Sequence, residues 1–155
     1  GYYEGIALEQ AGVKSAQAGI PEGSAGAAVY VWGDGEAVPE EAVGELQEKL
    51  NGMCPLGVTV TAQVAATKKV AVGATLRMRQ GADYSAASAA VTAAIKEWLG
   101  KRSVGESVYM ADIQRVILDA DPGVGRVEFL SASKDHEGEL GVVPIAGMVS
   151  LKEGT

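Results

Sequence analysis

The chain has 155 residues, of which 47% are hydrophobic and 21% charged, a composition that suits one globular domain or two small ones and argues against intrinsic disorder. Its net charge of −7 disfavours non-specific binding to nucleic acid, which depends on neutralising phosphates, and docking on anionic membranes. The single cysteine excludes an internal disulfide, and no apolar run approaches the roughly 20 residues of a membrane span.

The first half of the chain predicts two helices and three strands. Pro39 suits the first position of a helix, and an apolar stripe follows it at helical spacing. The stripe consists of Val43, Leu46, Leu50 and Met53. The elements expected in this half are the tail of a helix in 1–12, strands in 13–20 and 26–32, a helix in 39–52 and a strand in 58–64.

Residues 65–69 are the expected join between two lobes, because the alternating pattern restarts at Val70. A long helix capped by Asp83 or Ser85 then ends near Gly100. The further elements expected are a strand in 70–79, a helix of about 109–120 with Ser107 as its N-cap, a strand in 124–130 and a strand in 142–151. Pro144 and Gly147 favour an edge or a bulge in that last strand.

These elements predict an α+β fold of two small lobes, residues 1–66 and 67–155. Each lobe is expected to hold a short mixed or antiparallel sheet with one or two packed helices. Within the second lobe, Val127 and Phe129 are predicted to face inward while Arg126 and Glu128 face outward.

The residues that could carry chemistry favour structural roles. His136, the only histidine, lies in a polar stretch that predicts a solvated turn. Cys54 is expected to be a buried structural thiol, and Trp32 and Trp98 are expected to be packing anchors. Lys68-Lys69 and Lys101-Arg102 are interpreted as linker and helix-end residues.

Acidic residues gather at two places without forming a known site. Asp34, Glu36, Glu40 and Glu41 surround a glycine turn but lack the spacing of an EF-hand calcium loop. Asp112, Asp119 and Asp121 are interpreted as exposed charges at a helix. The glycine pairs match neither the GxGxxG nor the P-loop pattern. No catalytic, cofactor-binding or metal-binding residue is therefore predicted.

The order of these pieces resembles the C-terminal part of baseplate J-like proteins, which belong to contractile phage tails and related injection machines. Lys68-Lys69 departs from the more apolar or proline-containing entry to the family's second lobe. The matching pieces are Gly12-Val13 before Ala16-Gln17-Ala18, Glu41–Leu50 before Cys54-Pro55-Leu56-Gly57-Val58-Thr59-Val60, Val70–Leu76, Trp98-Leu99, Val104-Gly105-Glu106-Ser107-Val108-Tyr109 with Asp112-Ile113, Pro122-Gly123-Val124, and Glu139-Leu140 with Gly147-Met148-Val149.

The resemblance implies a structural, non-enzymatic component of a phage or prophage tail baseplate. Such a protein is made in the host cytoplasm and placed in the virion. Its expected partners are copies of itself and neighbouring wedge and hub proteins, with no cofactor. A second hypothesis is a non-catalytic module that binds a cell surface or carbohydrate through Tyr30, Trp32 and the Asp34 loop.

Overall fold

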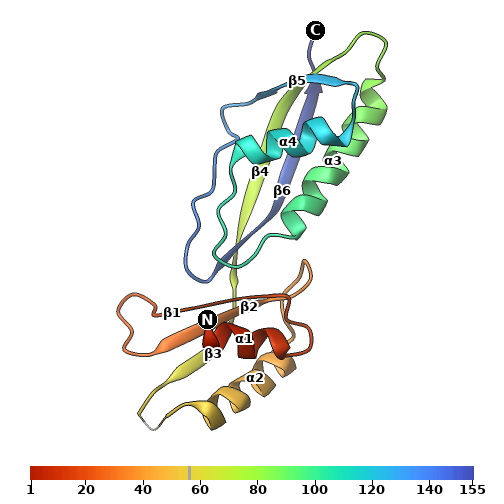
Figure 1. Cartoon of the computed structure of the whole chain (residues 1–155). Helices are drawn as coiled ribbons and strands as arrows, with labels where there is room; N and C mark the ends of the chain where they lie inside the picture. Colours follow the sequence, from red (N-terminus) through yellow and green to blue (C-terminus); the bar gives the residue numbers. More distant parts are fainter. Residues whose placement is uncertain (56) are drawn as a thin grey trace. The chain divides into compact units, whose positions relative to one another are not determined.

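A computed structural model describes residues 1–55 and 57–155, so Leu56 of the predicted Pro-Leu-Gly turn lies outside the described residues. The chain forms two compact units, each with two helices and a three-stranded sheet (Figure 1), and the α+β fold in two lobes is confirmed. Unit 1 comprises 1–68, 103–106 and 138–143, and unit 2 comprises 69–102, 107–137 and 144–155.

Unit 1 places two helices against a sheet of order β1-β2-β3. Its elements are α1 (Tyr2–Glu9), β1 (Ser15–Gly19), β2 (Ala27–Trp32), α2 (Glu40–Met53) and β3 (Val60–Val64). β1 runs antiparallel to β2, and β2 runs parallel to β3. A parallel pair requires a crossover between its strands, and α2 supplies it.

The predicted stripe of α2 is correct in its middle and wrong at its end. Leu46 and Leu50 are fully buried in the core of unit 1, whereas Met53 is 52% exposed. Met53 is the last residue of the helix, where the chain turns away from the sheet. The following strand begins at Val60 rather than at Val58, which is exposed.

Two short segments from later in the chain are part of unit 1. The Val104 N–H donates to Ser15 Oγ at 2.8 Å, and the Gly141 N–H donates to Gln17 Oε1 at 2.8 Å. Ser15 is paired with Trp32 across the sheet, so these segments lie over the face that carries the Trp32 ring. Trp32 is accordingly only 7% exposed, which confirms its predicted role as a packing anchor.

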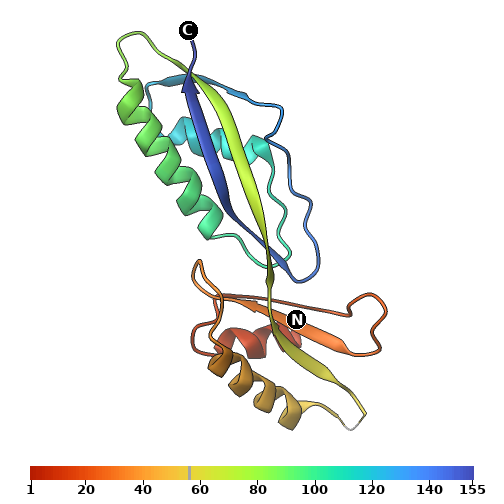
Figure 2. The same cartoon turned by 180° about the vertical axis from the view of Figure 1, so that it is seen from behind.

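Unit 2 is built on a sheet of order β5-β4-β6. Its elements are β4 (Ala66–Met78), α3 (Tyr84–Gly100), α4 (Met110–Ala120), β5 (Val124–Phe129) and β6 (Val142–Glu153), of which β4 and β6 begin in unit 1. β5 is antiparallel to β4, and β6 runs parallel to it (Figures 1 and 2). The first boundary between the units falls between Lys68 and Lys69, inside the join expected in 65–69. Residues 66–69 are the first residues of β4 rather than the expected linker.

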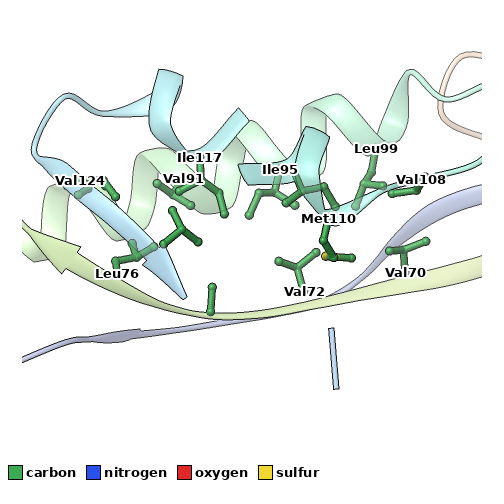
Figure 3. Packing of buried hydrophobic residues seen from close by; sticks show 14 residues of the cluster. Val70, Val72, Leu76, Val91, Ile95, Leu99, Val108, Met110, Ile117 and Val124 are labelled. Carbon is green, nitrogen blue, oxygen red and sulfur yellow. The ribbon is translucent and has the colours of Figure 1, made fainter. Parts of the chain in front are cut away.

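One face of this sheet carries the core of unit 2 (Figure 3). Alternate residues of β4 point towards α3 and α4, as the period of a strand requires. The fully buried large side chains include Leu76, Val72, Val91, Ile95, Leu99, Ile113 and Ile117. Each such side chain contributes roughly 1.5–3 kcal/mol by leaving water.

The two helices of unit 2 are capped differently. Of the two predicted caps of α3, Asp83 is the one that forms, because its Oδ1 accepts hydrogen bonds from the Ser85 and Ala86 N–H groups. The prediction of Ser107 as the cap of α4 is wrong. The N-cap residue is Tyr109, and the Met110 N–H donates to Asp135 Oδ1 at 2.7 Å.

Candidate functional site

His136 is not the solvated turn residue that its polar neighbours predict. It is 8% exposed, and its backbone exchanges two hydrogen bonds of 2.8 Å with Val108. Its Nε2 atom is buried and has no hydrogen-bond partner among the described residues. The prediction fails because the pairing with Val108, 28 positions earlier, draws the histidine inward.

Among the remaining candidate residues, Asp112 and Asp119 line one hollow together with Trp98 and Arg102. Cys54 is half-buried against the core of unit 1, less enclosed than expected. Asp34, Glu36 and Glu40 are exposed, and so is Asp119. No group of three or more histidine, cysteine or carboxylate side chains that could hold a metal is found in residues 1–55 and 57–155.

A groove follows the seam between α3 and α4 on unit 2. It consists of two adjoining hollows of about 330 and 410 Å³ that share Trp98, Val116 and Asp119. Ala94 and Ala120 complete its apolar floor. Trp98 is the largest side chain of this floor and is half-buried, so part of its surface is open to a partner.

Charged side chains of both signs line the groove. The Arg102 guanidinium carbon lies 3.9 Å from the centre of the Trp98 ring, and Arg102 Nε donates to the Trp98 carbonyl at 3.0 Å. Lys101 pairs with Glu97 at 3.2 Å and Arg115 with Asp112 at 3.7 Å. Exposed pairs of this kind contribute little to stability, so they are free to re-pair with a partner.

An apolar floor with an aromatic centre and a charged rim is the anatomy of a protein–protein contact. Tryptophan and arginine are the residues that most often dominate the binding energy of such contacts. The sequence predicts Trp98 only as a packing anchor. The signal that could have revealed the groove is the run of small and apolar residues one turn from Trp98 on α3 and facing it on α4.

No protein-family model matches this chain, and a comparison with curated proteins also finds no match. No helix in the described part of the chain combines the length and apolar character that a membrane crossing requires.

Proposed function

We propose that this protein is a structural component of the tail baseplate of a contractile phage or prophage. In this role it assembles with copies of itself and with neighbouring wedge and hub proteins in the virion. It acts by holding surfaces in place rather than by catalysis. The expected partners follow from the resemblance to baseplate J-like proteins.

The observation that supports the proposal is the order of elements in two α+β units. The resemblance implies a helix, a Pro-Leu-Gly turn and an alternating strand in the first lobe. α2 and β3 of unit 1 flank that turn. It implies a strand, an Ala-rich helix and a second helix in the next lobe, and β4, α3 and α4 follow in that order.

The groove between α3 and α4 is the surface that suits this role best. Its floor includes Ala94, where a larger side chain would fill the space that a partner would occupy. The alternative hypothesis, a carbohydrate-binding module, requires an accessible Trp32 ring. Trp32 is buried, so no observation favours that alternative.

The test begins with an antibody raised to this chain and intact tail particles induced from the source organism. Immuno-electron microscopy is expected to place the label at the distal end of the tail, with a band on a blot of the purified particles. Absence of the protein from purified particles would contradict the proposal, and label elsewhere on the particle would contradict the baseplate assignment.

A matched pair of variants tests the groove. Ala94→Arg places a long cation in the groove, whereas Ala111→Arg places the same side chain on an exposed position of α4. We expect particles assembled with Ala94→Arg to contain much less of the protein than particles assembled with Ala111→Arg. Equal incorporation of the two variants would show that the groove does not contact neighbouring proteins in the particle.

A further inference from the structure

The edges of the sheet in unit 1 are closed by side chains of the same unit. At β1, the Ala18 N–H donates to Glu4 Oε2 at 3.1 Å. At β3, the Ala62 N–H donates to Gln47 Oε1 at 2.7 Å, and Gln47 Nε2 donates to the Val60 carbonyl at 2.9 Å. These side chains form hydrogen bonds with backbone groups that would otherwise be available to pair with a further strand.

The β5 edge of unit 2 is protected in another way. β5 has six residues and carries Arg126 and Glu128, whose side chains pair at 2.6 Å. A short strand with charged side chains is a common defence against pairing with another chain.

The β6 edge has neither protection. β6 is 12 residues long, lies at the edge of its sheet next to β4, and carries no charged residue before Lys152. Met148 is 76% exposed, the highest exposure among the large hydrophobic side chains of the described residues. A long edge strand of this composition is a ready template for pairing.

A hydrogen bond next to the C-terminal end of β6 shows which of its backbone groups face β4 and which face the free edge. The Gly154 N–H donates to the Leu76 carbonyl of β4 at 2.9 Å. In a parallel ladder, every second residue directs both its N–H and its C=O to the same neighbouring strand. Val149 and Leu151 therefore direct their N–H and C=O groups to the free edge.

Helix α3, which lies beside the β6 edge, has a flank that a second helix could approach closely. α4 contacts β5, and α3 lies on the β6 side of the sheet (Figure 2). The flank of α3 turned away from α4 has a hollow of about 660 Å³ lined by Ser85, Ser88, Ala89, Thr92 and Ala93, together with the larger side chains of Tyr84 and Lys96. Small side chains allow a second helix to approach within the 8–10 Å typical of packed helices.

We propose that two copies of this chain dimerise through β6, paired antiparallel with Ser150 at the two-fold axis and with their α3 flanks side by side. Val149 then lies opposite Leu151 of the second copy, and Met148 lies opposite Lys152. The two three-stranded sheets become one sheet of six strands. This inference rests on unit 2 alone and does not depend on the proposed function.

A second copy fits this edge because the strand is self-complementary in this register. The outward N–H and C=O groups of Val149 meet those of Leu151, and Lys152 and Glu153 lie opposite uncharged residues, so no like charges of the two strands face each other. The same two-fold operation brings the small flanks of α3 together, which gives the dimer a second point of contact.

The first test is sedimentation of the full chain over a range of concentrations, with Val149→Pro and Val149→Thr as a matched pair. The wild-type chain is expected to show a concentration-dependent dimer. Proline removes the outward N–H that donates across the dimer, twice per dimer by symmetry, and is expected to weaken dimerisation roughly tenfold or more. Threonine keeps the N–H and is expected to dimerise like the wild type.

A second pair of variants tests the register. Met148→Lys places an ammonium group opposite Lys152 of the second copy, whereas Met148→Glu places a carboxylate there. Because both changes remove the same apolar contact, their difference reports the cross-strand charge pair. We expect the Met148→Lys dimer to dissociate roughly tenfold more readily than the Met148→Glu dimer.

A third pair tests the helix contact. Ala89→Arg enlarges the α3 flank and is expected to weaken the dimer, while Ala111→Arg on α4 leaves it unchanged. Circular dichroism of each variant checks that the chain remains folded.

Three results would overturn the proposal. A wild-type chain that stays monomeric at all concentrations excludes the dimer, and a dimer unaffected by Val149→Pro excludes the β6 edge. Equal dissociation constants for Met148→Lys and Met148→Glu exclude the register centred on Ser150. None of these measurements requires phage particles, so they are independent of the test for a baseplate role.

Discussion

Asp135 shows how a single residue can stabilise a helix far from it in sequence. Its carboxylate accepts the Met110 N–H at the start of α4, one of the helix donors that has no partner within the helix. Together with the pairing of Val108 and His136, this bond fixes the start of α4 to the segment that follows β5.

We predict that Asp135→Ala lowers the free energy of unfolding by about 1 kcal/mol, since a helix N-terminus loses its carboxylate acceptor. Lys134→Ala, at the exposed neighbouring position, is expected to change it little. Chemical denaturation followed by circular dichroism measures both. Equal stabilities of the two variants would show that the bond does not stabilise α4.

Glu128 makes stability depend on pH in the acid range. Arg77 donates to both carboxylate oxygens of Glu128, at 2.8 and 3.1 Å. These hydrogen bonds, with a smaller contribution from Arg126, hold the pKa of Glu128 below its ordinary value.

A carboxylate with a lowered pKa stabilises the folded state above its unfolded pKa, and this contribution is lost as the pH falls through its folded pKa. We therefore expect Glu128→Gln to be less stable than the wild type at neutral pH and to lose less stability on acidification. Glu48→Gln, on the exposed face of α2, serves as the control. Denaturation curves at several pH values measure the free energy of unfolding of each variant. If this free energy depends on pH in the same way in the wild type and in Glu128→Gln, the prediction is wrong.

At the scale of elements, the strands differ in how their edges are completed. Gln47 of α2 acts as a substitute neighbour for β3, because its amide group both donates and accepts as a strand residue would. A glutamine in the middle of a helix gives no sign of this role in sequence. β6, an edge strand of the sheet in unit 2, differs from β3 because it is long and, in the described part of the chain, no helix side chain bonds to its outer edge in the same way.

We predict that Gln47→Glu destabilises the chain by roughly 1–2 kcal/mol, since the carboxylate has no donor for the Val60 carbonyl and is placed beside it. Gln114→Glu, which adds the same charge on an exposed position of α4, is the matched control. Thermal unfolding of both variants gives the comparison. A loss no larger than that of the control would mean that solvent replaces the Gln47 amide without cost.

At the scale of the whole molecule, each unit is assembled from segments far apart in the chain. Residues 103–106 and 138–143 lie in the second predicted lobe but belong to unit 1. Gly141 is a close point of this packing, because a Cβ added there would lie 2.7 Å from the Tyr30 ring. The chain therefore returns twice to cover the sheet that residues 15–64 form.

Gly141 and Gly23 have similar positive φ angles, so comparing them distinguishes the cost of close packing from the cost of the backbone conformation. Gly141 and Gly23 have φ values of +74° and +78°, but a Cβ on Gly23 would meet no atom within 4 Å. We expect Gly23→Ala to cost about 1 kcal/mol from its conformation. Gly141→Ala is expected to cost roughly 1–3 kcal/mol more from overpacking against Tyr30, and equal losses in chemical denaturation would contradict the packing.

The α+β class and most of the helices and strands could be predicted from the sequence. The sequence also narrowed the cap of α3 to Asp83 or Ser85, and it favoured an edge or a bulge for the strand that forms β6. These depend on local periodicity and on residues with fixed turn or capping preferences, which act within a few positions. β2 shows this well, since apolar residues on both faces are typical of a strand that is covered on both sides, and both of its faces are covered.

The burial of His136, the Asp135 cap and the groove around Trp98 appear only in the folded chain. The same holds for the segments that complete unit 1 and for the sheet edges that side chains close. Each of these depends on groups separated by tens of positions, whose meeting is set by the path of the chain rather than by local pattern. A single sequence contains no direct signal for such a meeting, because the energy that selects it comes from packing and hydrogen bonds that exist only after folding.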